Sequence, residues 1–93
     1  ELIFEVISNS SGSSNVFLSR MPSVIKRDFS TKSTLDIQLK DMNICLRAGE
    51  KKRSPLFLAT VAKELYKLAG EKFDPREDSS AVIKLYELFA EKA

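Results

Sequence analysis

Histidine is absent from this sequence of 93 residues, and cysteine occurs only once, at Cys45. The lack of histidine excludes the commonest general base, the commonest metal ligand and every histidine-containing catalytic triad. A single cysteine can form neither an internal disulfide nor a zinc site built from cysteines, which favours a reducing compartment. We therefore expect no metal site, and a cytoplasmic protein whose chemistry is limited to Lys, Asp, Glu, Ser or Tyr side chains.

Glycine and proline are scarce, with three residues of each, and long apolar runs are missing. Apolar runs such as residues 55–62 fall far short of the ~20 residues that span a bilayer, so no membrane partner is expected. A composition of 43% hydrophobic and 30% charged residues is typical of a folded globular protein. The length leaves room for one small domain, which we place at residues 1–93.

Net charge is also low, because fifteen Lys and Arg residues face thirteen Asp and Glu residues, leaving +2 at pH 7. That excess is too small for a protein that binds by neutralising many phosphates, so no nucleic-acid partner is expected. The basic run at residues 51–53 ends a predicted helix, where cations complement the helix dipole, and a phosphate contact is the alternative. The serine-rich segment at residues 8–15 is typical of a turn, with a backbone anion site as its alternative.

The first third of the chain predicts two short helices. The first residue is Glu1 rather than Met, and positions 2–7 are apolar except for Glu5, so we expect that the chain has been cut from a longer protein. The helix over these residues ends in the turn at residues 8–15. Ser14 or Asn15 is suited to cap a second helix, which Pro22 interrupts or restarts.

The clearest helical pattern runs from Ser33, which resembles the start of a capping box with Asp36, to about Lys52. One apolar stripe at helical spacing is formed by Leu35, Leu39, Met42 and Leu46. A second stripe on almost the opposite side is formed by Ile37, Ile44 and Ala48. Two stripes indicate a helix that is contacted from two directions, with Cys45 as a small core residue.

The last forty residues predict two further helices. Ser54 and Pro55 suit the start of a helix that extends to about Phe73. Its apolar face is formed by Phe57, Val61, Leu65 and Leu68, with Leu58, Ala62, Tyr66 and Ala69 beside them. Residues 74–77 break the chain, and Asp78 or Ser79 can cap a final helix. Because no alternation of apolar and polar residues predicts a strand, we expect an all-α fold, a compact helical bundle.

Two neighbouring charged residues differ in their surroundings on the predicted helix at residues 33–52. Lys40 shares a polar sector with Asp36, Asn43 and Arg47, and from the residues alone it is an ordinary exposed lysine. Asp41 lies on an otherwise apolar side, where a carboxylate is costly without hydrogen bonds. We therefore expect Asp41 to have a structural role, bonded to amides at the N-terminus of another helix or to a serine such as Ser79 or Ser80.

The chain carries several short elements in a fixed order, which are Phe29, Leu39-Lys40-Asp41-Met42 followed by Ile44, Ser54-Pro55-Leu56 followed by Ala59, Leu65-Tyr66, and Asp78-Ser79-Ser80-Ala81-Val82. In order and spacing they resemble the C-terminal helical domain of the β-hydroxyacid dehydrogenases, a domain of the 6-phosphogluconate dehydrogenase-like type. The most similar branch contains 3-hydroxyisobutyrate dehydrogenase and tartronate semialdehyde reductase. The resemblance begins at a stretch like residues 5–12 and covers nearly the whole chain.

This resemblance implies a two-domain, homodimeric enzyme that oxidises a small 3-hydroxy acid of the 2-methyl or 2-hydroxymethyl type with NAD or NADP. In such enzymes an N-terminal Rossmann domain carries the dinucleotide, and a helix between the domains carries the lysine that transfers the proton. The sequence has no Gly-x-Gly-x-x-Gly motif and no match to that lysine motif, so we expect a fragment that is catalytically inactive alone and holds no catalytic residue.

The resemblance also implies roles for two residues. Lys40 corresponds to the lysine that reaches the cofactor near its nicotinamide end, and Phe29 corresponds to a wall of the substrate cleft. The basic residues 51–53 depart from the neutral, glycine-containing connection that such domains often carry. The alternative reading is a non-enzymatic helical module that self-associates through the two stripes around Leu39 and Ile44.

Overall fold

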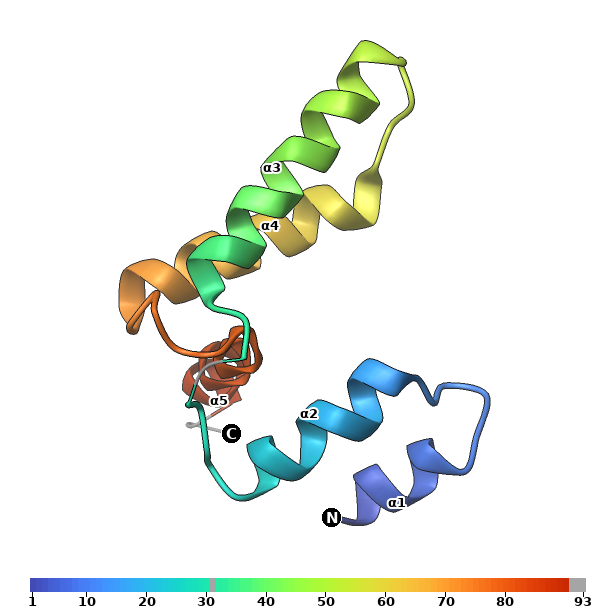
Figure 1. Ribbon diagram of the computed structural model, residues 1–93, viewed down its shortest axis with the longest axis vertical. Helices are drawn as coiled ribbons and strands as arrows, with labels where there is room; N and C mark the ends of the chain where they lie inside the picture. The colour runs from blue at the N-terminus through green and yellow to red at the C-terminus, as the bar shows by residue number, and fades with distance from the viewer. Residues whose placement is uncertain (31, 91–93) are drawn as a thin grey trace.

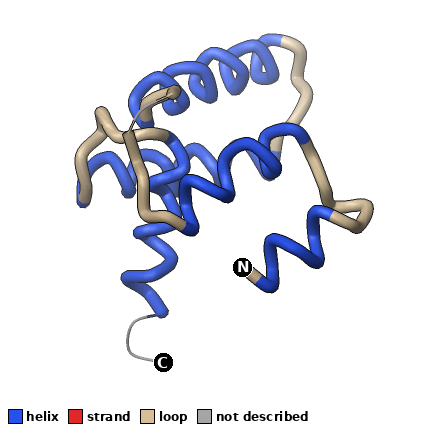
Figure 2. The backbone as a smooth tube through the Cα atoms, turned by 60° about the horizontal axis from the view of Figure 1, so that its bottom comes forward, coloured by secondary structure: helices blue, strands red, loops and turns tan. Residues whose placement is uncertain are grey.

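The structure, a computed structural model, describes residues 1–30 and 32–90 and is helical throughout (Figure 1). Its elements are α1 (Leu2–Ser8), α2 (Asn15–Ile25), α3 (Leu35–Lys51), α4 (Phe57–Lys72), the short 3₁₀ helix η1 (Ser79–Val82) and α5 (Ile83–Ala90). Figure 2 shows only helices and loops in this part of the chain, and an isolated bridge between Thr34 and Asp78 is the sole strand-like pairing there. The predicted all-α class is confirmed.

Four of the helices form two pairs joined through η1, and α5 contacts η1 and α4. Helices α3 and α4 make a long hairpin at one end of the molecule, and α1 and α2 lie together at the other end (Figure 1). The helix η1 contacts α2, α3, α4 and α5, so it connects the pairs. The main core around it consists of Val24, Phe29, Leu35, Ala69 and Ala81. No helix within residues 1–30 and 32–90 combines the length and apolar character that crossing a bilayer requires.

Helix α2 confirms the predicted cap but not the predicted interruption. The Ser14 hydroxyl accepts a hydrogen bond from the Phe17 amide at 3.0 Å. The helix then continues through Pro22 to Ile25, so the expected break is wrong. Proline removes its own amide donor and crowds the preceding turn, but the Pro22 carbonyl still accepts from the Lys26 amide at 3.1 Å.

The start of α3 lies one residue later than predicted. Thr34 is the N-cap, its hydroxyl accepting from the Ile37 amide at 3.3 Å and also bonding to the Asp36 carboxylate. Ser33 is instead bonded to the segment before α5, because its carbonyl accepts from the Ser79 amide at 2.6 Å. A long-range contact therefore decides which of two adjacent hydroxyl residues caps the helix.

The start of α4 was also predicted too early. Ser54 and Pro55 remain in the turn, and the helix begins at Phe57 without a side-chain cap. The Ser54 amide donates to the Gly49 carbonyl at 2.8 Å, closing the end of α3, and Arg53 adopts a left-handed φ of 55°. Ser54, which is a typical capping residue, therefore closes the end of α3 rather than starting α4.

Two predicted apolar faces are uncovered. Ile37 and Ile44 are 48% and 49% exposed on α3, and Cys45 beside them is exposed rather than in the core. Within the described residues α3 is therefore packed from one direction, not two as predicted. On α4, Val61 is 60% exposed, and Phe57 and Leu58 at the start of the helix are exposed as well. Periodicity identifies these faces correctly as apolar but cannot say whether this chain covers them.

Candidate functional site

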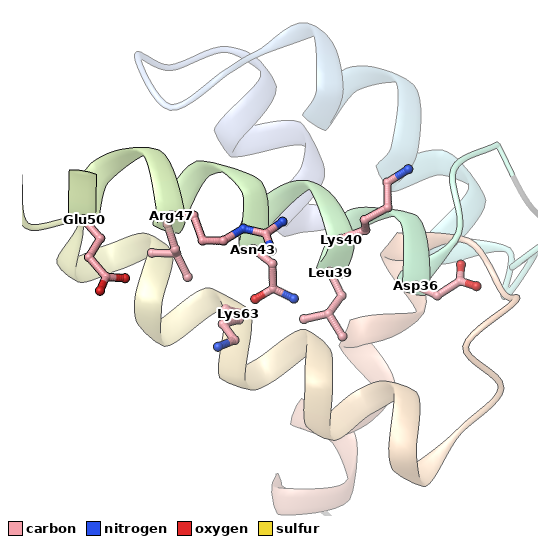
Figure 3. A pocket seen from close by; sticks show the side chains of 8 residues that line it. Asp36, Leu39, Lys40, Asn43, Arg47, Glu50 and Lys63 are labelled. Atoms are coloured by element: carbon pink, nitrogen blue, oxygen red, sulfur yellow. The ribbon is translucent and has the colours of Figure 1, made fainter. Parts of the chain in front are cut away.

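An open groove of about 490 Å³ runs between α3 and α4 (Figure 3). Its lining residues are Asp36, Leu39, Lys40, Asn43, Leu46, Arg47, Glu50 and Lys63. All but Lys63 come from α3, where spacings of three and four residues place them on one side of the helix. The groove therefore gathers the polar sector that the sequence predicts around Lys40.

Cations outnumber carboxylates in this groove. Its three cations are Lys40, Arg47 and Lys63, and its two acids are Asp36 and Glu50. In the described part of the chain, none of the ion pairs involves these three cations. Ammonium and guanidinium groups suit the oxygen atoms of phosphates and carboxylates. The groove therefore carries a net charge of +1 from these five side chains.

Lys40 lies at the rim of the groove, where the rigid α3 backbone holds it. Its side chain is exposed, and Figure 3 shows it extending outward from α3 on the side away from Lys63. Leu39 and Asn43 point toward α4 in the same view. Lys40 is therefore placed where a body outside this chain can reach it.

Lys63 was missed as a groove residue, because the sequence places it on the solvated face of its helix. It is half-buried and faces the groove across from α3. Periodicity within one helix cannot identify the side that borders a neighbouring helix. Lys63 borders the groove because of the way in which α4 crosses α3.

Phe29 lies in the core and is not among the residues that line this groove. The Lys84 ammonium lies 4.6 Å from the centre of its ring, and the Arg27 guanidinium lies 5.2 Å from it. Lys84 is also paired with Glu77 at 2.8 Å. The structure therefore brings Phe29 together with α5 rather than with Lys40, and its role in a substrate cleft stays a prediction.

The structural role expected of Asp41 is filled by Asp78 instead. Asp41 is exposed, and among the described residues its carboxylate does not bond to Ser79 or Ser80. The expectation for Asp41 is wrong because the side of α3 that carries it is uncovered, so water solvates this carboxylate. Asp78 is only 3% exposed and caps η1, a position that the sequence does predict.

Asp78 accepts five hydrogen bonds from three segments. Its Oδ1 accepts from the Arg20 guanidinium at 3.3 Å and from the amides of Lys32 and Ser33 at 2.9 and 3.1 Å. Its Oδ2 accepts from the Ser80 amide at 3.1 Å and the Ser80 hydroxyl at 2.6 Å. Burial alone would raise the pKa of Asp78, but these hydrogen bonds outweigh it and lower the pKa from 3.8 to about 2. The ionised carboxylate thus anchors the loop that leads into α3, and with it the Lys40 side of the groove.

Metal binding has no structural support in the described residues, since no group of three or more Cys, Asp and Glu side chains is placed to hold an ion. Two polar clusters that the sequence analysis singles out residues for are the groove around Lys40 and the hydrogen-bonded cluster around Asp78. Of these, the groove is open to a ligand, whereas the Asp78 oxygens are already engaged. The groove is therefore the candidate functional site.

Known proteins similar to this chain are dehydrogenases. L-Threonate dehydrogenase from Cupriavidus necator is 33% identical over 86 residues, which are 92% of this chain and 29% of that protein. 2-(Hydroxymethyl)glutarate dehydrogenase from Eubacterium barkeri is 33% identical over 88 residues, 94% of this chain and 29% of that protein. The chain thus spans about three tenths of the length of these relatives.

A solved structure has the same fold. The crystal structure of 3-hydroxyisobutyrate dehydrogenase from Salmonella typhimurium superposes with a TM-score of 0.86 at 32% identity, over 90% of this chain and 30% of that one. The sequence model of one family, described as NAD-binding of NADP-dependent 3-hydroxyisobutyrate dehydrogenase, matches residues 1–86. The predicted cofactor class, NAD or NADP, agrees with that description. This chain belongs to the family of NAD-binding domains of NADP-dependent 3-hydroxyisobutyrate dehydrogenase.

Proposed function

We propose that this chain is the C-terminal, substrate-side and dimerisation domain of an NAD(P)-dependent dehydrogenase acting on a small 3-hydroxy acid. The family match over residues 1–86 carries this proposal. Relatives about three times as long support a parent chain that also contains a Rossmann domain. In this proposal the parent enzyme is cytoplasmic, and the isolated chain is inactive because it holds no catalytic residue.

Lys40 is the residue of this chain that we assign to the cofactor, because its exposed cation stands at the rim of a positively charged groove. NAD(P) supplies hydride transfer when bound, and the protein supplies binding and orientation. Lys40 would meet oxygen atoms of the dinucleotide with a charge-assisted hydrogen bond. Arg47 and Lys63 add positive charge along the same groove. Phe29 is proposed as a wall of the substrate cleft, and it lies in the core next to α5, apart from this groove.

The substrate in this proposal is a small hydroxy acid. The relatives named for L-threonate and 2-(hydroxymethyl)glutarate both act on hydroxylated carboxylates, which supports that class for the parent enzyme. The test is the reduction of NAD⁺ and NADP⁺ by the parent chain with a panel of such acids. Activity in the parent chain and none in the 93-residue chain is the expected result. A parent chain that lacks a glycine-rich nucleotide-binding segment and any such activity would contradict the proposal and favour a non-enzymatic helical module.

Lys40→Ala in the parent enzyme should raise the KM for NAD(P) by about tenfold, which corresponds to about 1.4 kcal/mol of lost binding. The exposed position of Lys40 predicts an unchanged melting temperature. Lys26→Ala, which removes an exposed lysine outside the groove, is the matched control and should leave the KM unchanged. Cofactor kinetics that respond equally to both substitutions would remove Lys40 from the site.

A further inference from the structure

A second cavity, of about 510 Å³, lies where α2, α3, α4 and η1 meet. Its volume is typical of small-molecule sites, which span about 300–1,000 Å³. Its polar lining consists of Arg20, Gln38, Tyr66 and four serine residues, and none of the described residues that line it is an Asp, Glu or Lys. Apolar side chains of α2 and η1, such as Phe17 and Val82, form the rest of the wall. We call this cavity the Gln38 pocket.

The Gln38 pocket has no uncompensated charge among its described residues. Its lining cation, Arg20, is paired with the buried Asp78 carboxylate at 3.3 Å. The two charges cancel, so a carboxylate or phosphate would be attracted only weakly. The pair uses Nη1 of Arg20, and a guanidinium has five N–H donors in all. The pocket therefore suits an uncharged ligand group that forms hydrogen bonds.

The side chains of Gln38 and Tyr66 are suited to bind hydroxyl groups. Both residues are half-buried, and within residues 1–30 and 32–90 neither side chain forms a hydrogen bond, whereas the Ser14 and Ser80 hydroxyls are bonded to the Phe17 amide and to Asp78. An amide and a phenol each donate and accept hydrogen bonds, as a ligand hydroxyl does. Burial raises the pKa of Tyr66, so its phenol keeps its proton at neutral pH. A ligand that excludes water from the pocket must bond to both side chains, because a buried polar group without a partner is costly.

We propose that the Gln38 pocket binds the hydroxylated carbon chain of a polyhydroxy acid, with Gln38 and Tyr66 as specificity-determining residues. This proposal rests on the proposed dehydrogenase function and narrows its substrate class to acids with several hydroxyl groups. An acid that carries a methyl group in place of a hydroxyl would leave these side chains unpaired. Sites built to bond a hydroxyl discriminate strongly against analogues that lack it.

The Gln38 pocket and Lys40 border the same uncovered face of α3. At about 100° per residue, Ile37 and Asp41 lie between Gln38 and Lys40 around the helix. Both residues are exposed, so this face is open. A substrate whose hydroxylated chain occupies the pocket can therefore extend its reacting carbon over this face, toward the lysine that we assign to the cofactor.

Steady-state kinetics of the parent enzyme test the proposal with acids that differ in hydroxyl count. The probes are L-threonate and its stereoisomers, which carry three hydroxyl groups, and 3-hydroxyisobutyrate, which carries one. For the best trihydroxy acid, we expect kcat/KM to exceed that for 3-hydroxyisobutyrate by about tenfold or more. Gln38→Leu and Tyr66→Phe should each lower kcat/KM for that trihydroxy acid about tenfold, while the value for 3-hydroxyisobutyrate changes less than about twofold. Both substitutions nearly conserve volume, so the melting temperature of the parent enzyme should change little.

Tyr86→Phe is the matched control for Tyr66→Phe. Tyr86 is the other tyrosine of the chain, is 54% exposed on α5 and does not line the Gln38 pocket. Its substitution should leave kcat/KM unchanged for all of these acids.

Three results would overturn the proposal: a preference for 3-hydroxyisobutyrate over every trihydroxy acid, equal losses for the two kinds of acid in the Gln38 and Tyr66 variants, or an equal effect of Tyr86→Phe and Tyr66→Phe. Each of them would leave the dehydrogenase function intact, since the enzyme would still oxidise a hydroxy acid. A parent chain that oxidises none of these acids would also overturn the proposal. The wider panel of hydroxy acids described above then decides separately whether the dehydrogenase function fails with it.

Discussion

Asp78→Ala should lower the free energy of unfolding by about 3–5 kcal/mol, a large share of the 5–15 kcal/mol that stabilises a typical domain. The substitution removes the acceptor of five hydrogen bonds and leaves the partly buried Arg20 guanidinium without its counter-charge. Urea denaturation followed by circular dichroism measures the loss. Asp41→Ala removes an exposed carboxylate from α3 and should change stability by less than about 0.5 kcal/mol. Equal effects at the two positions would contradict the account of Asp78.

The pH dependence of the free energy of unfolding tests the stabilising role of Asp78 independently. Because the pKa of Asp78 falls from 3.8 to about 2 on folding, its ionisation stabilises the fold fully above about pH 5. That contribution, about 2 kcal/mol, is lost as the pH falls from about 4 to about 2. Asp78→Asn abolishes the titration, so the stability difference between this variant and the original chain should narrow by that amount on acidification. A difference that is constant with pH would show that Asp78 is not preferentially ionised in the fold.

Gly49→Ala should destabilise the α3–α4 hairpin by about 1–3 kcal/mol. Gly49 is buried, and a Cβ there would lie 2.8 Å from Leu56 Cδ1 and 3.0 Å from the Ser54 carbonyl oxygen. Relief of the second contact requires movement of the backbone that turns the chain into α4, and with it of the groove. Thermal unfolding measures the change.

Gly70→Ala is the matched control for this substitution. Gly70 lies near the end of α4, and its added Cβ would meet only Pro75 Cβ at an ordinary 3.7 Å. Alanine is the better helix former, so this variant should be stabilised by about 0.5 kcal/mol. A melting temperature that falls equally in both variants would mean that helix propensity, rather than the close contact at Gly49, controls the result.

The sequence predicted the helices well where one face repeats over several turns. Helix α3 is predicted within one residue at each end, because its stripe from Leu35 to Leu46 is long and packs against α4 and η1. The errors lie at helix starts, where backbone hydrogen bonds outside the helix decide. Ser33 and Ser54 both have the character of caps, but the backbone of Ser33 bonds to Ser79 and that of Ser54 bonds to Gly49.

Helical spacing also makes part of the candidate site predictable from the sequence. The row from Asp36 to Arg47 follows from helical spacing alone, and the structure places it along one groove. The contribution of Lys63 depends on how α4 crosses α3, which no pattern within one helix encodes. Asp41 was given a structural role because its side of α3 is apolar, yet the chain leaves that side uncovered. Burial depends on how the helices pack together, which the pattern of one helix does not encode.

The most direct test of the central claim is the rate at which Lys40 is acetylated by an amine-acetylating reagent. Mass spectrometry measures this rate in the parent enzyme with and without NADPH. The claim is that α3 presents this lysine to the nucleotide. Saturating NADPH should slow the acetylation of Lys40 severalfold while Lys26, Lys51 and Lys52, which are exposed outside the groove, react as before. A rate at Lys40 that is unchanged by bound NADPH would contradict the claim.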